Sequence, residues 1–132
     1  SSYESEVEKP LDFFQNCLVN SVVFGAYSDK KIIGIATLTK ENISKLSHKA
    51  YLSSVFVIPK FQNQGVAKKL LNTVIEHSKP NIEQIVLTVA SDNSPAINLY
   101  KKFNFQIYGE ELKALKNGDK YIDELMMKLF IR

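Results

Sequence analysis

The most informative hydrophobic pattern in the chain lies between residues 50 and 78. An apolar, β-branched run ends at Pro59, a polar loop with one glycine follows, and apolar residues then recur at helical spacing from Val66 to Ile75. A short apolar run followed by apolar residues at i, i+3 and i+4 favours a strand and then an amphipathic helix. This stretch therefore predicts a strand over Ala50–Ile58, a tight loop, and a helix that ends near Ser78.

Similar apolar, β-branched runs predict further strands on both sides of this unit. These runs are Ser21–Tyr27, Lys31–Leu38, Ile82–Ala90, Phe105–Leu112 and Tyr121–Phe130. Ser28-Asp29-Lys30 is a short turn that makes the first two runs a hairpin, and Asn117-Gly118 is a strong turn pair between the last two. The almost wholly apolar run Ile85–Val89 predicts a strand that is covered on both faces. A strand, a helix and a strand of these lengths predict a parallel pair with a right-handed crossover.

Two more helices are expected from apolar spacing. Leu11, Phe14, Cys17 and Leu18 indicate an amphipathic helix from Pro10 to about Asn20, with Cys17 as a core residue. The second helix begins with Ser94 as its cap and Pro95 at its first position, and it places Ala96, Leu99, Tyr100 and Phe103 on one face. Residues 1–9 are polar and acidic and are expected to be poorly ordered, and the polar segment 40–49 is expected to be a loop near a substrate site.

Length and composition indicate a single domain over residues 1–132. The chain is 45% hydrophobic, and its formal net charge of +3 comes from scattered lysines, which argues against nucleic-acid binding. No long apolar run predicts a membrane span, and the first residues lack the pattern of a signal peptide. The single cysteine excludes an intrachain disulfide and a cysteine-rich metal site, and the two histidines lack ligand spacing, so we expect a cytoplasmic protein without a metal.

The loop after Pro59 has the chemistry of an anion site. The first amides of a helix have no intrahelical partners, and the helix dipole places partial positive charge at that end. Gly65 allows a ligand to approach the backbone, and Lys68 and Lys69 add full positive charge. A phosphate group fits these features, although the loop matches neither a Walker A motif nor a Gly-x-Gly-x-x-Gly motif. A plain structural turn remains the alternative.

Two motifs resemble the GNAT superfamily of N-acetyltransferases. Gln62-x-x-Gly65-x-Ala67 after an apolar strand is similar to the family's acetyl-coenzyme A pyrophosphate loop. Asn93-x-x-Ala96-x-x-Leu99-Tyr100-x-x-x-Asn104-Phe105 is similar to its second hallmark, in which Gly often stands at the position of Asn104. Asn adopts the left-handed conformation of a helix end second best after Gly. The likeness covers about residues 20–130, and the N-terminal region is short for the family.

The resemblance implies an α/β (α+β) fold, in which helices flank a mixed central sheet and a splayed parallel strand pair holds acetyl-CoA. It implies direct acetyl transfer from this cosubstrate to a primary amine of a small molecule or protein, by a monomer or a homodimer. The backbone amide of Val57 would stabilise the oxyanion, and Tyr100 would protonate the leaving thiolate. The residues expected to bind acetyl-CoA are Phe56, Val57, Ile58, Gln62, Asn63, Gln64, Gly65, Val66, Ala67, Lys68, Asn93, Ala96, Tyr100 and Lys102.

Several alternatives stay open at this point. Tyr100 also fits a core position, and Asn93 also fits a residue that only shapes the turn before the helix. The general base is undetermined among Glu41, His48, Asp92, Asp123 and Glu124. The chain is also compatible with an inactive coenzyme A-binding sensor or interaction module, or with a structural domain that binds no cofactor.

Overall fold

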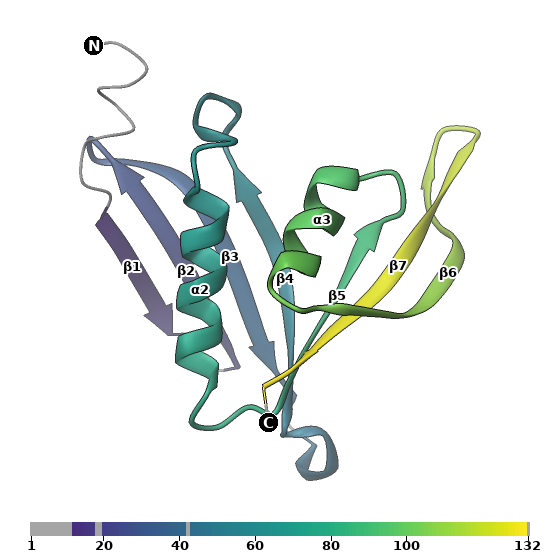
Figure 1. Ribbon diagram of the computed structural model, residues 1–132, viewed down its shortest axis with the longest axis horizontal. Helices are drawn as coiled ribbons and strands as arrows, with labels where there is room; N and C mark the ends of the chain where they lie inside the picture. The colour runs from purple at the N-terminus through teal and green to yellow at the C-terminus, as the bar shows by residue number, and fades with distance from the viewer. Residues whose placement is uncertain (1–11, 18–19, 42, 132) are drawn as a thin grey trace.

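The computed structural model describes residues 12–17, 20–41 and 43–131, which form one mixed seven-stranded sheet with two α-helices (Figure 1). Residues 1–9, for which we predicted poor order, lie outside the described residues. The strands are β1 (Asp12–Cys17), β2 (Ser21–Ser28), β3 (Lys31–Lys40), β4 (Lys49–Val57), β5 (Gln84–Ala90), β6 (Gln106–Asn117) and β7 (Lys120–Phe130). The helices are α2 (Val66–Ser78) and α3 (Ser94–Lys102), with short 3-10 turns η1 (Ser44–Leu46) and η2 (Pro59–Phe61).

The strand order is β1-β2-β3-β4-β5-β7-β6. Among the strands that the structure describes, only β4 and β5 are parallel, and every other neighbouring pair is antiparallel. The predicted hairpin and the predicted parallel pair are thereby confirmed. Both helices lie on the same face of the sheet in Figure 1, and residues of both belong to one hydrophobic core. The opposite face of the sheet is called the helix-free face below, with reference to the described residues.

Helix α2 packs closely against the middle of the sheet. Its residues Leu70, Leu71 and Val74 are completely buried, as their apolar spacing predicts. A side chain at Gly34 of β3 would have its Cβ 3.1 Å from Leu70 and 3.2 Å from Val66, so the glycine allows this close approach. The start of α2 is thereby held beside the end of β4, which is paired with β3.

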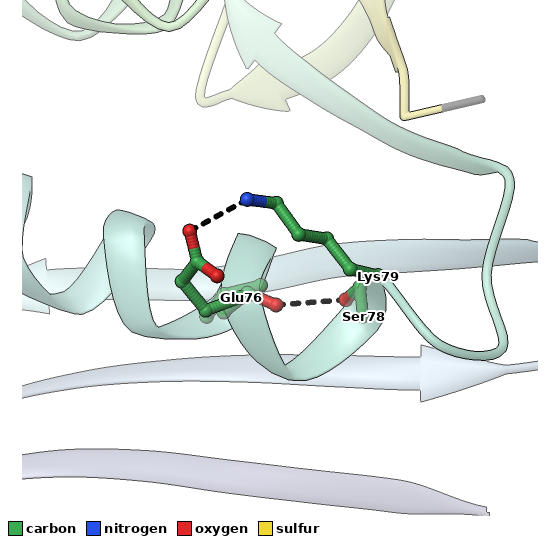
Figure 2. Close-up of polar contacts among 4 residues, drawn as sticks. Glu76, Ser78 and Lys79 are labelled. Carbon is green, nitrogen blue, oxygen red and sulfur yellow. Dashed lines mark hydrogen bonds and ion pairs between the residues drawn. The ribbon is translucent and has the colours of Figure 1, made fainter.

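Two side-chain contacts lie at the C-terminal end of α2 (Figure 2). The buried Ser78 hydroxyl donates to the Val74 carbonyl at 2.8 Å, which satisfies a polar group in the core. On the solvent side, Lys79 Nζ lies 2.7 Å from Glu76 Oε1. This exposed ion pair contributes little stability, and the helix end itself is closed by backbone bonds, from the Lys79 amide to the Ile75 carbonyl and from the Ile82 amide to the Ser78 carbonyl.

The two parallel strands pair only at their beginnings. Cα partners run from Lys49 with Gln84 to Tyr51 with Val86, and the strands then diverge. A β-bulge falls at this point in β4: Ser54 has φ 54°, and the register between β3 and β4 shifts beside it. Because a bulge bends its strand, the carboxyl end of β4 stays with β3 and leaves β5. The result is a gap between β4 and β5 beside Val57.

The predicted helix from Pro10 to Asn20 is wrong where the structure describes it. Asp12–Cys17 is a strand that pairs antiparallel with β2, and the Phe14 ring lies 4.9 Å from the Tyr27 ring. Apolar spacing in a short segment fits a strand as well as a helix, and pairing with the edge of the sheet decides between them. Cys17 is exposed on this edge strand, so its predicted place in the core is also wrong.

The sheet differs from the sequence prediction in two further places. Strands β6 and β7 form one long hairpin with a turn at Gly118 and Asp119, because a bulge around Lys113 lets the pairing continue past Leu112. Among the described residues, helices cover only one face of strand β5: Val86 is buried but lies outside the main core, and Thr88 on the same face is exposed. The prediction that β5 is covered on both faces is therefore wrong for the face that carries Thr88.

Candidate active site

A cleft of about 660 Å³ lies where β4 has left β5, on the helix side of the sheet. Most of the residues that sequence motifs predicted for the cofactor line it together. These are Phe56, Val57, Gln62, Asn63, Gly65, Val66, Ala67, Lys68, Asn93, Ala96, Tyr100 and Lys102. Two groups of residues, 56–68 and 93–102, are thus gathered in one hollow at the carboxyl end of the parallel pair. This is where α/β sheets hold their ligands.

The beginning of α2 forms one wall of the cleft. Gly65 is its N-cap, with φ 83° and ψ 5°, and no side chain makes a capping hydrogen bond there. The first intrahelical bond runs from the Lys69 amide to the Gly65 carbonyl at 3.1 Å, so the preceding amides have no helical acceptor. A Cβ on Gly65 would meet no protein atom within 4 Å, so the space beside this residue is open. The open amides, together with the nearby Lys68, suit a diphosphate.

Side chains of the loop hold its backbone instead of capping the helix. Gln62 Nε2 donates to the Val57 carbonyl at 2.9 Å, and Gln64 Nε2 donates to the Lys60 carbonyl at 2.9 Å. The Ile58 amide donates to the Ile33 carbonyl of β3. Gln64 and Ile58 are the two predicted cofactor residues that do not line the cleft.

The direction of the Val57 amide follows from its neighbour. The Ile58 N–H bonds to β3 at 2.9 Å, and successive residues of an extended strand direct their N–H groups to opposite sides. The Val57 N–H therefore points away from β3, toward the side that β5 has left. A ligand carbonyl in the cleft is thus offered a backbone donor at this position.

Helix α3 forms the opposite wall, and its own side chain closes its beginning. Asn93 is the N-cap, and its Oδ1 accepts from the Ala96 amide at 3.3 Å. The prediction that Ser94 caps this helix is wrong by one residue, since the Ser-Pro pair occupies the first helical positions instead. Asn93 therefore shapes the turn, and it is also one of the residues that line the cleft.

Tyr100 is held in the cleft wall by the end of α3. The Phe105 amide donates to the Tyr100 carbonyl at 3.1 Å, and the Asn104 amide donates to the Lys101 carbonyl at 3.0 Å. Asn104 has φ 72°, so these bonds form a Schellman motif, as the left-handed role of Asn104 predicted. The rings of Tyr100 and Phe105 lie 5.6 Å apart, which is the apolar contact that accompanies this motif.

Tyr100 combines burial with access to the cleft. It is 7% exposed, and burial raises the pKa of its phenol above the ordinary value of 10.0. The side chain is therefore protonated throughout the neutral range and can donate its proton. Tyr100 therefore packs in the core, as one interpretation of the sequence predicted, and it also lines the cleft, whereas its contact with the thiol stays a prediction.

None of the candidate bases lines the cleft. Asp123 has a structural task, because its Oδ1 accepts from the Lys113 amide at the bulge of β6. Glu41 belongs to a second cavity of about 440 Å³ near the other end of α2, and His48 gives its carbonyl to the start of β5. Asp92 follows β5, and Glu124 of β7 is opposite Ala90, the last residue of β5.

Sequence reasoning missed five residues of the cleft. They are Val55, Phe61, Pro95, Asn98 and Leu99. Phe61 belongs to the 3-10 turn η2 and is buried, whereas Asn98 shares with Pro95 the exposed side of α3. The helical spacing of Pro95, Asn98 and Lys102 would have placed the first two beside the third.

Comparison with known proteins agrees with this geometry. The model of the acetyltransferase (GNAT) family matches residues 1–105, and the chain belongs to this family. It is 36% identical over 102 residues to the L-amino acid N-acetyltransferase AaaT of Escherichia coli, a match that covers 75% of this chain and 62% of that protein. It is 28% identical over 91 residues to a spermine/spermidine N(1)-acetyltransferase of Bacillus subtilis, covering 65% and 60%.

A solved structure shows the same fold. The crystal structure of a probable acetyltransferase from Staphylococcus epidermidis is similar with a TM-score of 0.76 at 30% identity, covering 84% of this chain and 68% of that one. The mixed sheet with its parallel β4–β5 pair is therefore the GNAT fold. The chain spans about 60% of the length of the two curated relatives.

The described residues also bear on other kinds of site. Acetyl-CoA is the cosubstrate typical of this family, and the uncapped amides and open space at Gly65 fit its diphosphate. No three His, Cys, Asp or Glu side chains within the described ranges come close enough together to hold a metal ion. Neither helix in these ranges is long and apolar enough to cross a membrane.

Proposed function

We propose that this chain transfers the acetyl group of acetyl-CoA directly to a primary amine. The observation that carries the proposal is that one cleft joins three groups: the open amides of α2, the backbone amide of Val57 and the phenol of Tyr100. An anion holder, an oxyanion donor and a proton donor are what this reaction needs. The two curated relatives differ in the acceptor that their names state, so likeness alone does not choose an acceptor for this chain.

In this scheme, the residues have separate tasks. Acetyl-CoA supplies the activated acetyl thioester when bound. Gly65, Val66 and Ala67 would bind its diphosphate through backbone amides, with Lys68 and Lys102 adding charge. The pantetheine arm, which carries amides, would lie along the open side of β4 and reach Asn93.

The transfer itself would be served by two groups of the chain. The Val57 amide would donate to the carbonyl oxygen while the amine nitrogen forms its bond to the carbonyl carbon. As the carbon–sulfur bond breaks, Tyr100 would give its proton to the sulfur, and the amine would lose its extra proton to a base or to water. Only about four in ten thousand molecules of an amine with a pKa near 10.4 are neutral at pH 7, so this deprotonation is part of the barrier.

The test combines binding with turnover. Acetyl-CoA at a hundred times its dissociation constant should stabilise the protein by about 2.7 kcal/mol, which a thermal melt detects. Thiol release is then followed with polyamines, aminoglycosides, amino acids and lysine peptides. Binding without release from any acceptor would favour the inactive sensor or interaction module, and neither binding nor release would favour a structural domain.

The remaining features of the proposal are the setting and the partners. We expect the protein to act in the cytoplasm as a monomer or a homodimer, without a metal ion. Its ligands would be acetyl-CoA and an amine, with no nucleic acid or membrane involved. All the residues assigned to cofactor binding stay predictions, and two of them, Ile58 and Gln64, do not line the cleft.

A further inference from the structure

We infer that the acceptor is an amine with a second positive charge, and that Glu124 is the residue that selects it. The inference rests on the proposed function, because it concerns the amine that receives the acetyl group. It starts from the two sides of the gap between β4 and β5. The cofactor cleft lies on the helix side, so the helix-free face is the side from which an amine can reach Val57.

The register of the strands shows which residues surround this opening. The parallel pairing ends at Tyr51 and Val86, and Ala90 is four residues further along β5. Four residues beyond Tyr51 on β4, with one more for the bulge residue, is Phe56, so Phe56 and Ala90 are at the same level. Phe56 is 51% exposed, and its cross-strand partner Ile35 places it on the helix-free face. The amine therefore has an apolar wall on the β4 side of the gap.

The other side of the opening is acidic. Glu124 is opposite Ala90 on one side and opposite Glu111 of β6 on the other, so all three share a face. That face is the helix-free one, because Met127, three residues on, is fully buried in the core beneath the helices. Two carboxylates directly opposite each other repel, and neither has an ion-pair partner within 4 Å in the described part of the chain.

A cationic ligand relieves this repulsion. Glu124 is partly buried one strand beyond the gap, at about one inter-strand spacing of 4.8 Å from β5. It does not line the cleft beside Val57, and its place one strand beyond the gap is within the reach of a second ammonium group on a short aliphatic chain. A diamine would thus place its neutral nitrogen in the gap, its methylenes along Phe56 and its charged end at Glu124. A carboxylate at that end would be repelled.

The experiment compares acceptors of equal length with different ends. Putrescine, n-butylamine and 4-aminobutyrate are titrated calorimetrically into the protein loaded with coenzyme A, and kcat/KM is measured with acetyl-CoA. We expect putrescine to be favoured over n-butylamine by about fivefold in both measurements, and 4-aminobutyrate to be disfavoured. Glu124→Gln should remove the preference, and Glu124→Lys should reverse it toward 4-aminobutyrate.

The matched control is Glu110→Gln, which removes a carboxylate from the same hairpin on the opposite face, where Glu110 is the partner of Leu125. It should keep the preference for putrescine. An unchanged preference in Glu124→Gln, or no binding of putrescine to the wild type, would overturn the inference while leaving acetyl transfer to other amines intact. If acetyl-CoA itself does not bind, the proposed function fails, and putrescine titrated into the unloaded protein still reports whether Glu124 holds the cation.

Discussion

The beginnings of the two helices meet the same physical problem in opposite ways. Both have amides without helical partners, and both line one cleft. Asn93 closes the beginning of α3 with its own side chain, whereas α2 begins at Gly65 without a side-chain cap. In the proposed scheme the two helix ends have different roles: the open end would receive the charge of the ligand, and the closed end would give α3 a fixed position from which Tyr100 would act.

The largest expected effect tests the role of Tyr100, which lies on the closed helix α3. Tyr100→Phe should lower kcat by about a hundredfold, because general acid catalysis contributes that much, and should leave the KM for acetyl-CoA unchanged. Steady-state kinetics by thiol detection measure both constants. The Phe105 contact keeps the ring in place, so unchanged kcat would remove Tyr100 from the reaction.

The same variant has a pH signature. Burial raises the pKa of the Tyr100 phenol, so the folded protein keeps this proton above pH 10, where the unfolded chain releases it. The stability linked to this group is complete below pH about 10 and is lost as the pH rises through the folded pKa. Thermal melts between pH 9 and about 11 should therefore fall less steeply for Tyr100→Phe than for the wild type.

The next effect tests the open helix. Gly65→Ala adds a Cβ where φ is 83° and places it in the space proposed for the diphosphate, so the dissociation constant of acetyl-CoA should rise about tenfold. Gly118→Ala is the matched control, because Gly118 has φ 64° and equally open surroundings in the β6–β7 turn. It should cost similar stability without changing acetyl-CoA binding in calorimetry.

A smaller effect tests the cap of the closed helix. Asn93→Ala removes the acceptor for the Ala96 amide and should lower the free energy of unfolding by about 1 kcal/mol. Ser94→Ala, at the position that the sequence pattern favoured, should change it by less than about 0.5 kcal/mol. Denaturant titrations of both variants decide between the two positions, and a larger loss for Ser94→Ala would contradict the assigned cap.

The smallest effect concerns the C-terminal end of α3. Asn104 adopts φ 72°, which glycine adopts easily, so Asn104→Gly should change the free energy of unfolding by no more than about 0.5 kcal/mol. Acetyl-CoA binding should be unchanged, because the proposed scheme places no part of the ligand near Asn104. The same denaturant titration and calorimetry apply. A loss of binding would show that Asn104 has a role beyond the helix end.

The sequence predicted best where local pattern and chemistry agree. The chain from Pro59 through Gly65 to the helical spacing after it defines a strand, a loop and a helix to within a few residues. The left-handed conformation predicted for Asn104 is confirmed, because few residues tolerate these backbone angles. The Gln62 and Asn93 motifs predicted residues that line one cleft, although only the fold shows that Gln62 bonds the Val57 carbonyl.

The failures come from long-range contacts that no local pattern contains. Phe14 and Cys17 are in a strand because β2 offers an edge to pair with, and Leu112 is inside a hairpin because a bulge at Lys113 allows it. The pairing of Glu111 with Glu124 across the hairpin is equally invisible in the sequence, since it depends on a register that the bulge shifts. The selectivity proposed for the acceptor side therefore could not be predicted from the sequence alone.

The short parallel pairing of β4 and β5 has a consequence for the protein without its ligand. Beyond Tyr51 and Val86, both strands have an inner edge in the middle of the sheet, which is the kind of edge that other extended chains can join. Amide protons along this divide should exchange with deuterium quickly in the free protein and slowly once an extended ligand lies between the strands. Cofactor binding would then complete the sheet as well as supply the reaction.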